Sequence, residues 1–428
     1  MPQGGTVSLL GPMTLYGLRH VLYMAGGHTK GASYRFFMDN ARSLGVIEAV
    51  KIVRFEYECI KAVHAFTREH SINCDSRELE TVDVVYDQGQ WDEAVEAIGF
   101  MRNVMEKDEP AAQYKFWSSE EAEKRYLTPG ALGAISYAAG SLSAYKLVVG
   151  ILKLGLAKGL NLQTNTPATT ISRVADTASQ RRKWIVETPR GSIAAENVVL
   201  TTNGYTAHLY PALQGVIVPL RGHITAHRPG SGMPTGGLPT TYSFIYDNGY
   251  EYMIPRPPGS KFAGDIVIGG GLTKAVKEGL YEYGTTDDTT TDPRIIDYLK
   301  GTTITYFGDN WGEDNKKGRI RQEWSGIMGY SADGFPLIGH IPGEEGLSIA
   351  ASFQGHGMVL CFLCAKALTE ILLGADDKQL DPWFPRAFRM RKERLQKKFE
   401  GRLHVKAAKE LEVKSQLRKA AGHAKPAS

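Results

Sequence analysis

Residues 346–374, "GLSIAASFQGHGMVLCFLCAKALTEILLG", contain the stretch that decides the fold. A short apolar run ends in Phe353-Gln354, a Gly-His-Gly turn follows, and an apolar helix runs directly from that turn to Gly374. Two glycines in the turn permit close approach of a ligand, and the helix start offers unpaired N–H groups with partial positive charge. The stretch therefore predicts a strand, a ligand-binding turn and a helix. An ordinary strand-to-helix turn that needs a positive φ is the alternative.

The rest of the chain alternates helical and strand-like segments. Helices are predicted at 46–70, 91–107 and 142–158, the last with Ser141 as its N-cap. Strands are predicted at 81–88, 161–174 and 182–205, with a hairpin at 189–191. Residues 216–305 are strand-like throughout and suggest a mostly antiparallel sheet. The predicted class is α/β (or α+β).

Composition restricts the location and the partners. The chain has 428 residues, a net charge of +4 and four cysteines. So few cysteines give no disulfide framework and fit a reducing compartment, and neither a basic leader nor a long apolar run is evident, so a cytoplasmic protein without a membrane partner is expected. Residues 386–428 carry 14 Lys and Arg against 4 Asp and Glu. This tail could bind a polyanion, but it lacks interleaved aromatic residues, so a solvated tail and no nucleic-acid partner are predicted.

Several other segments, taken together with residues 346–374, resemble segments of one known protein family. "SADGFPLIGHIP" (331–342) precedes the Gly-His-Gly turn as a compact Pro-x-x-Gly loop. Together they resemble the C-terminal flavin-binding segment of the FAD-dependent oxidoreductases of the D-amino acid oxidase family. Other matching segments follow the family's order: the Gly26-Gly27-His28 loop, "LNLQTNTPATTISR" (160–173), "ENVVLTTNGYT" (196–206) and "VPLRGHI" (218–224). Fungal and bacterial amine or amino-acid oxidoreductases, including γ-glutamylputrescine-oxidase-like enzymes, are the most similar members.

The resemblance implies a Rossmann-like FAD-binding domain with an inserted substrate domain. Its expected limits are 26–80, 135–210 and 325–374 for the FAD-binding domain, 81–134 and 211–324 for the substrate domain, and 375–428 for a C-terminal helix and basic tail. FAD is the expected cofactor. The residues that the resemblance assigns to it are Gly26, Gly27, His28, Ala168, Thr202, Asn203, Gly204, Gly339, Gly355, His356, Gly357 and Met358.

The family also implies a reaction and a substrate surface. The expected reaction is hydride transfer from a C–H bond next to an amine nitrogen to the flavin, with a small amine or amino acid as substrate. Arg221, His223, Tyr252 and Arg256 fall on strands of the expected substrate sheet, where a cation can pair with a carboxylate. His356, Arg221 and Tyr252 are the expected catalytic residues. For each, an ordinary residue satisfied by its neighbours is the alternative.

One departure from the family concerns the dinucleotide turn. No G-x-G-x-x-G occurs in the sequence, and the 25 residues before Gly26 are too few for a strand, a helix and a second strand. The expectation is an N-terminally truncated Rossmann-like domain with an atypical segment at 1–25, weak or absent FAD binding, and exposed apolar faces. The alternative function is therefore a truncated, FAD-deficient relative: a pseudoenzyme or a misassigned gene start.

The remaining motif is Cys361-x-x-Cys364. Both cysteines lie in the apolar helix that follows the Gly-His-Gly turn, and no second pair or histidine cluster accompanies them. Core packing of both side chains is expected, and no metal site is predicted.

Overall fold

The main sheet of the protein has nine strands. The structure is a computed structural model that describes residues 8–10, 26–31, 33–174, 183–247 and 249–401. Its strands are β2 (His28–Thr29), β3 (Arg77–Val85), β4 (Tyr114–Ser118), β5 (Gly133–Ser141), β11 (Ile217–His227), β12 (Thr241–Tyr246), β13 (Gly249–Pro255), β14 (Ile266–Gly269) and β15 (Ile320–Ser331). They run in the order β15-β11-β14-β13-β12-β3-β5-β2, with β4 beside β5. All neighbours are antiparallel except β12 and β3, so the expected mostly antiparallel sheet is confirmed.

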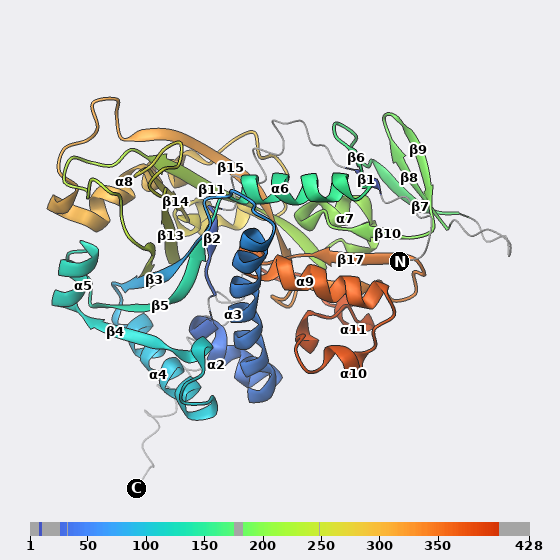
Figure 1. The fold of residues 1–428 in the computed structure, drawn as a ribbon, viewed down its shortest axis with the longest axis horizontal. Coiled ribbons are helices and arrows are strands. Elements are labelled where there is room, and N and C mark those ends of the chain that lie inside the picture. Colours follow the sequence, from blue (N-terminus) through green and yellow to red (C-terminus); the bar gives the residue numbers. More distant parts are fainter. Residues whose placement is uncertain (1–7, 11–25, 32, 175–182, 248, 402–428) are drawn as a thin grey trace, which may run out of the picture.

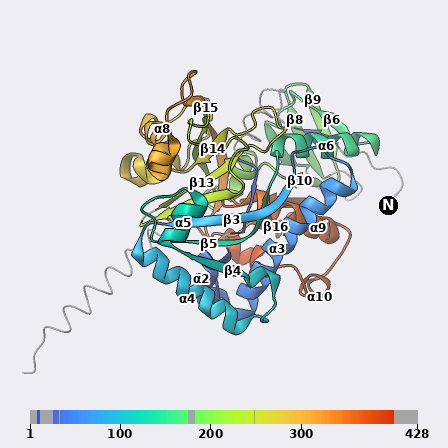
Figure 2. The same cartoon turned by 60° about the vertical axis from the view of Figure 1, so that its left-hand side comes forward.

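Three helices cover one end of this sheet (Figures 1 and 2). They are α2 (Ser33–Leu44), α3 (Val46–Glu69) and α4 (Gln88–Val104). Val50 and Val53 of α3 and Ile98 of α4 are buried in one core with Ile135 of β5. The three- and four-residue spacing of apolar side chains that predicted helices at 46–70 and 91–107 is thus the spacing of the buried face. α5 (Ser119–Tyr126) begins with a capping box between Ser118 and Glu121.

A smaller, partly parallel sheet carries the predicted strand, turn and helix. It contains β10 (Val198–Leu200), β17 (Leu347–Ala351) and β16 (Leu337–His340), with β10 parallel to β17. α9 (Gly357–Leu372) follows β17 and packs against α3, where Ile52 and Ile60 contact the same core as Leu360. Figure 1 shows α3 standing between the large sheet and α9. This interface holds the two sheets together.

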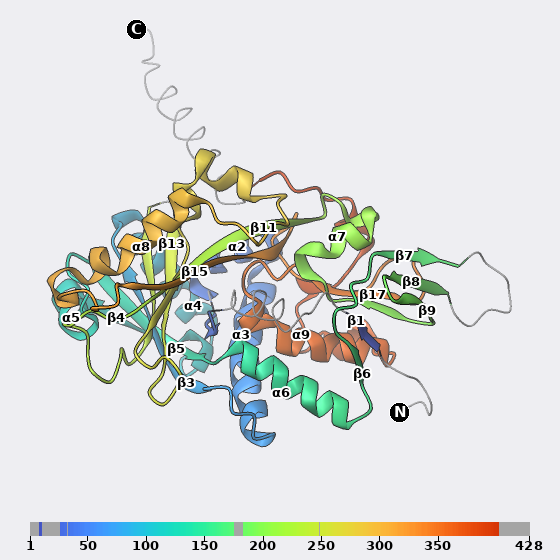
Figure 3. The same ribbon diagram turned by 90° about the horizontal axis from the view of Figure 1, so that it is seen from above.

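Two further small sheets complete the described strands. β1 (Ser8–Leu10) pairs in parallel with β6 (Asn161–Gln163), and β7 (Thr170–Arg173), β8 (Trp184–Thr188) and β9 (Gly191–Ala195) form an antiparallel sheet that projects from the body (Figure 3). The predicted hairpin at 189–191 joins β8 to β9. α6 (Ala144–Ala157) matches the predicted helix, but its N-cap is Ser143, because Ser141 still belongs to β5.

Three large apolar side chains of α6 and β10 are partly exposed. Ile151 and Leu156 of α6 are 37% and 48% exposed, and Val199 of β10 is 39% exposed. In Figure 3, α6 lies along the edge of the molecule. Large apolar side chains on a helix and a strand otherwise seek a partner surface.

Two of the longer helices were not expected: α2, and a helix near the end of the strand-like stretch 216–305. α8 (Pro293–Phe307) lies within the stretch predicted as strands and packs on β11. Its N-cap, Asp292, accepts from two N–H groups of the first turn, and Pro293 occupies the first helical position. Ile295, Leu299 and Thr302, three and four residues apart, face the core. The strand prediction for this part is wrong because the surrounding Pro and Gly clusters obscured the helical spacing.

The remaining helices are short. They are α7 (Thr206–Leu209), α10 (Asp377–Leu380), α11 (Lys392–Leu395) and 3-10 turns at Pro110–Ala112, Asn203–Tyr205, Pro211–Leu213, Leu272–Lys274, Val276–Glu282, Gly308–Trp311 and Arg386–Phe388. No helix in the described part of the chain is long and apolar enough to cross a membrane. The expected domain limits after residues 80, 134 and 324 fall inside β3, β5 and β15. Of the expected N-terminal segment and basic tail, 1–7, 11–25 and 402–428 lie outside the described residues.

Candidate cofactor and substrate site

The turn before α9 is held in an unusual backbone conformation. Ser352 and Gln354 have φ of 64° and 54°, in the left-handed region that side chains disfavour, and Gly355 has φ of 76°. Asn203 Oδ1 accepts from the N–H groups of Ser352 (2.9 Å) and Phe353 (3.4 Å). The Asn203 loop and the turn, both predicted from the sequence to contact the cofactor, therefore meet in space.

The start of α9 is open to a ligand. His356 is its N-cap, and among the described residues no side chain caps the first turn. Gly357 and Met358 thus present N–H groups of the kind that a helix leaves without an internal partner. Gly355 is exposed beside Met328 and Tyr330 of β15, since a Cβ at this glycine would lie 3.4 Å from Met328 Sδ and Tyr330 OH. An anionic or electron-rich group suits this site.

The Gly26-Gly27-His28 loop lies against the large sheet. A Cβ on Gly26 would lie 2.7 Å from Ile254 Cδ1 and 3.4 Å from the Tyr252 ring. Gly27 has φ of 81°, and a Cβ there would lie 1.8 Å from the carbonyl oxygen of Leu142. His28 pairs with β5, and its burial holds its pKa well below the ordinary value. Gly27 is therefore required by its contact with backbone, whereas Gly26 lies close to the side chains of Ile254 and of the expected substrate residue Tyr252.

Strand register decides which side chains share the Tyr252 face. Tyr252 is paired with Ser243 and with Gly269, and Ser243 is paired with Asp83. Paired residues in neighbouring strands point to the same face of a sheet. Tyr252, Ser243 and Asp83 therefore line the face on which Gly26 lies. Burial raises the pKa of Tyr252, so its phenol is neutral at physiological pH.

Arg221 and His223 do not share that face. In β11, Ile224 is paired with Gly269, which is paired in turn with Tyr252, so Ile224 points to the Tyr252 face. Residues 221 and 223 lie an odd number of positions from Ile224 along the strand and therefore point to the opposite face. Arg221 forms a bidentate ion pair with Glu282 (2.7 and 3.1 Å). His223 Nε2 accepts from the Asp292 N–H (2.8 Å), and burial lowers its pKa to about 4. The structure corrects the expectation of one surface: these two side chains are engaged elsewhere.

The remaining predicted residues lie in separate places. Arg256 directly follows β13, and Ala168 lies between β6 and β7. Thr202 bonds to Thr206 through their hydroxyls (3.0 Å). Gly204 packs under β15, where a Cβ would lie 2.5 Å from the Met328 carbonyl oxygen. Gly339 instead faces Met390 and Ile371 across β16. Their ligand roles stay predictions.

A buried ion pair beside Gly26 was missed by the sequence reasoning. Lys30 pairs with Asp83, which is fully buried, and also contacts the Ser243 hydroxyl. Tyr34 and Tyr137 donate from their hydroxyls to Asp83 Oδ2, at 2.6 and 3.0 Å. Burial lowers the pKa of Lys30, although Asp83 opposes that change. The signal was available: an aspartate stands alone in the apolar strand "TVDVVY".

A second cation lies between this pair and the turn. The Arg35 guanidinium stacks over the Tyr250 ring at 4.4 Å, and within the described residues no carboxylate lies at ion-pairing distance from it. The ring of Phe36 meets that of His356 edge-on, with centroids 6.1 Å apart. Burial, together with the charges of Arg35 and Lys30, lowers the pKa of His356 to about 4. The imidazole is therefore neutral at physiological pH.

The two cysteines of α9 differ in their surroundings. Cys364 is buried as expected, but Cys361 is accessible to solvent, which corrects that half of the prediction. Burial among protein atoms nevertheless raises the pKa of Cys361 to about 12. The Cys361 thiol lies one turn after Gly357, near the start of α9. In the described part of the chain no group of three or more His, Cys, Asp or Glu side chains is arranged to hold a metal ion.

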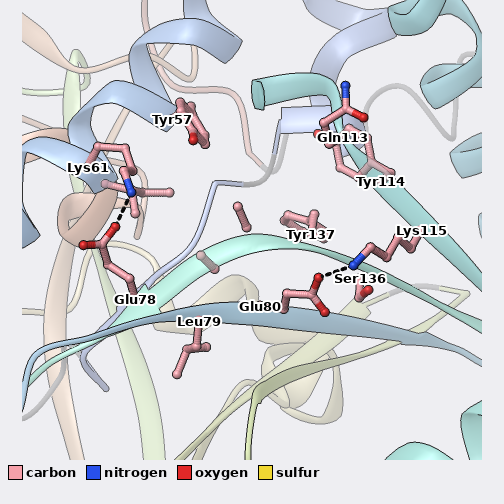
Figure 4. Close-up of a pocket in the computed structure, with 13 residues that line it drawn as sticks. Tyr57, Lys61, Glu78, Leu79, Glu80, Gln113, Tyr114, Lys115, Ser136 and Tyr137 are labelled. Atoms are coloured by element: carbon pink, nitrogen blue, oxygen red, sulfur yellow. Dashed lines mark hydrogen bonds and ion pairs between the residues drawn. The ribbon is translucent and has the colours of Figure 1, made fainter. Parts of the chain in front are cut away.

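A separate cavity of about 480 Å³ lies behind Asp83. Figure 4 shows Tyr57 of α3, Gln113 and Tyr114 above its floor of β3 and β5, with the ion pairs Lys61–Glu78 and Lys115–Glu80 at the edges. Tyr137 lines this cavity and donates to Asp83. The cavity thus adjoins the buried ion pair through Tyr137.

Comparisons with known proteins place the chain in a family. A family model described as FAD dependent oxidoreductase matches residues 20–371. The chain belongs to this family. Among curated members, the probable oxidoreductase OrdL of Rhizobium meliloti is 25% identical over 260 residues, covering 59% of this chain and 53% of that protein. The glycine oxidase of Pseudomonas putida is 26% identical over 193 residues, covering 45% of each. The chain thus matches about half the length of these curated relatives.

Several solved structures share the fold. Glycine oxidase from Geobacillus kaustophilus superposes with a TM-score of 0.64 at 20% identity, over 86% of this chain and 88% of that one. L-proline dehydrogenase from P. horikoshii gives 0.61 at 16%, over 91% and 100%. Iminodiacetate oxidase from Chelativorans sp. BNC1 gives 0.61 at 15%, over 89% and 93%. The family and fold-class predictions are confirmed.

FAD is the cofactor of this family, and the described residues fit one part of the FAD molecule. The uncapped start of α9 and the exposed Gly355 suit an electron-rich edge of the flavin, and Gly26 lies beside the Tyr252 ring. For the diphosphate, the sequence offers no G-x-G-x-x-G turn. The flavin end of the site is thus the part that the observed residues support.

Proposed function

We propose that the chain uses FAD to oxidise a carbon–nitrogen bond of a small amine or amino acid. The observation that supports this most is the contact between Gly26 and the Tyr252 ring, because it joins the cofactor loop to the substrate sheet. When bound, FAD would supply the oxidant that takes a hydride from the carbon next to the nitrogen, and water would hydrolyse the substrate imine that results. The side chains of the chain bind and orient the substrate.

Arg35 is the cation that we assign to a substrate carboxylate. Arg221 already has a carboxylate partner in Glu282, whereas Arg35 lies over Tyr250 without one at ion-pairing distance among the described residues. A guanidinium binds a carboxylate through two parallel hydrogen bonds. The Tyr252 ring supplies an apolar wall beside Gly26, and the neutral His356 imidazole can exchange hydrogen bonds without adding charge.

The Arg35 assignment has a direct comparison within the chain. Arg35→Met should raise KM for amino acids about 100-fold, the value of one charge-assisted contact, and leave KM for an amine without a carboxylate nearly unchanged. Arg221→Met serves as the matched variant, with an effect on stability rather than on KM. An equal loss with both substrate classes would contradict the assignment.

The alternative is a chain that does not hold FAD, and it is favoured by the missing G-x-G-x-x-G. Purification of the full chain, followed by an absorbance scan and a titration with FAD, decides between the two. Flavin absorbance at one FAD per chain, bleached without oxygen by glycine, L-proline or iminodiacetate, supports the enzyme. A folded, colourless chain that takes up no FAD would sink the proposal.

A further inference from the structure

Besides Asn203, the side-chain amide of Gln354 holds the left-handed turn at 352–355. Gln354 Nε2 donates to the Ser352 carbonyl oxygen (2.9 Å) and to Ser331 Oγ (2.8 Å), while the Gln354 N–H donates to the Gly329 carbonyl oxygen (3.0 Å). The first of these bonds closes the turn on itself, and the second fixes it to the loop after β15. Non-glycine residues keep a positive φ only where their surroundings impose it.

The loop that receives Gln354 is in turn fixed by an arginine from the end of the described chain. Arg394, just before the end of α11, donates to both carboxylate oxygens of Asp333, at 2.9 and 2.7 Å. Its remaining N–H groups donate to the carbonyl oxygens of Phe335 (2.9 Å), Pro336 (2.8 Å) and Arg389 (3.2 Å). The side chains of Arg394 and Asp333 are only 8% and 13% exposed. This guanidinium therefore defines the path of the 333–336 loop.

Ser331 connects the two ends. Its hydroxyl lies within hydrogen-bond distance of the Phe335 carbonyl oxygen (2.7 Å) and of Asp333 Oδ1 (3.1 Å), and it accepts from the Phe335 N–H (3.1 Å). Because the same oxygen accepts from Gln354, its position depends on the loop that Arg394 holds. A continuous path of hydrogen bonds runs from Arg394 to the turn before α9.

We propose that Arg394 is a positioning residue, which acts through Asp333 and Ser331 on Gln354 and so holds the turn that presents the start of α9 to the cofactor. The inference rests on the proposed cofactor site at that turn. It makes cofactor affinity depend on the segment after α9, which lies outside the residues 20–371 that match the family.

A double-mutant cycle tests the path. Arg394→Lys keeps the charge but loses the bidentate geometry, Ser331→Ala removes only the connecting hydroxyl, and Gln354→Met removes the amide. Each single change should weaken FAD binding about five- to tenfold, the value of one hydrogen bond. In the Gln354→Met background, neither of the other changes should weaken it further. Effects that multiply in the double variants would overturn the proposal.

The control is another bidentate ion pair. Arg321 pairs with Asp265 in the large sheet, at 3.0 Å for one contact, and Arg321→Met should lower the melting temperature without changing the Kd for FAD. An equal effect of Arg321→Met on that Kd would show a general loss of stability and would overturn the positioning role.

A readout without FAD separates this inference from the proposed function. Amide hydrogen exchange of 352–358 in the flavin-free chain should become faster with Arg394→Lys or Ser331→Ala, and should show no added effect in the Gln354→Met background. If the wild-type chain takes up no FAD, the proposed function fails, while this exchange pattern still decides whether Arg394 holds the turn. Exchange at 352–358 that is unchanged in both single variants refutes it.

Discussion

Replacement of Gly27 by alanine tests how the loop before β2 is fixed. Gly27 has φ of 81°, and an added Cβ would lie 1.8 Å from the Leu142 carbonyl oxygen, so backbone must move. The left-handed conformation costs a side chain about 1–2 kcal/mol. Displacement would also break the bond from the Leu142 N–H to the Gly27 carbonyl oxygen (2.9 Å), which adds about 1 kcal/mol. We expect Gly27→Ala to lower the free energy of unfolding by about 2–3 kcal/mol.

The matched control is Gly159→Ala. Gly159 has φ of 90° and no atom within 4 Å of an added Cβ, so it should lose only the conformational part, about 1–2 kcal/mol. Urea unfolding of both variants, followed by tryptophan fluorescence, measures the difference. If Gly27→Ala unfolds at the same urea concentration as Gly159→Ala, the contact with Leu142 does not constrain the loop.

Three further outcomes are expected. Tyr137→Phe should cost about 1.5–3 kcal/mol of stability in urea unfolding, because buried Asp83 loses a donor. Tyr242→Phe, whose buried hydroxyl has no hydrogen-bond partner among the described residues, should cost nothing, and equal losses in the two variants would contradict this expectation. Burial alone would raise the pKa of Asp333, but Arg394 and Lys397 hold it below the ordinary value of about 4. The stability that this lowered pKa contributes is present above about pH 4 and is lost in more acid solution. The difference in unfolding free energy between wild type and Asp333→Asn should therefore become smaller as pH falls from 7 to 3, and a constant difference would refute this role of Asp333. The NMR signal of the His356 imidazole, identified by its absence from the His356→Gln variant, should titrate with a pKa of about 4. A midpoint near 6.5, the ordinary value for histidine, would show that the imidazole is not buried.

The periodic spacing of apolar residues predicted the helices and strands whose surroundings are uniform along their length. α3 buries one continuous face, so its three- and four-residue spacing was legible in the sequence. The sequence also predicted β17, the turn and α9, because the glycines at 355 and 357 indicate the change from strand to helix. α8 was not, since its signals, Asp292 and Pro293, stand among other turn residues.

The sequence did not predict to which face of the sheet the strand side chains point. Arg221 and Tyr252 both lie on strands of one sheet, yet they point to opposite faces. Faces alternate at every residue, so their assignment depends on the register between strands from distant parts of the chain. The Lys30–Asp83 pair was missed for a related reason: 53 residues separate the two partners.

By itself, the sequence determined the class of fold, the order of its main elements and, through spaced glycine motifs, the resemblance to an FAD-dependent family. Such features are local, since periodicity and glycine backbone freedom act within a few residues. Only the tertiary structure decided that Gly26 meets Tyr252, that Glu282 occupies Arg221, that Arg35 remains available, and that Arg394 is linked to the turn before α9. These are contacts between distant segments, and their geometry is set by how the sheets and helices pack.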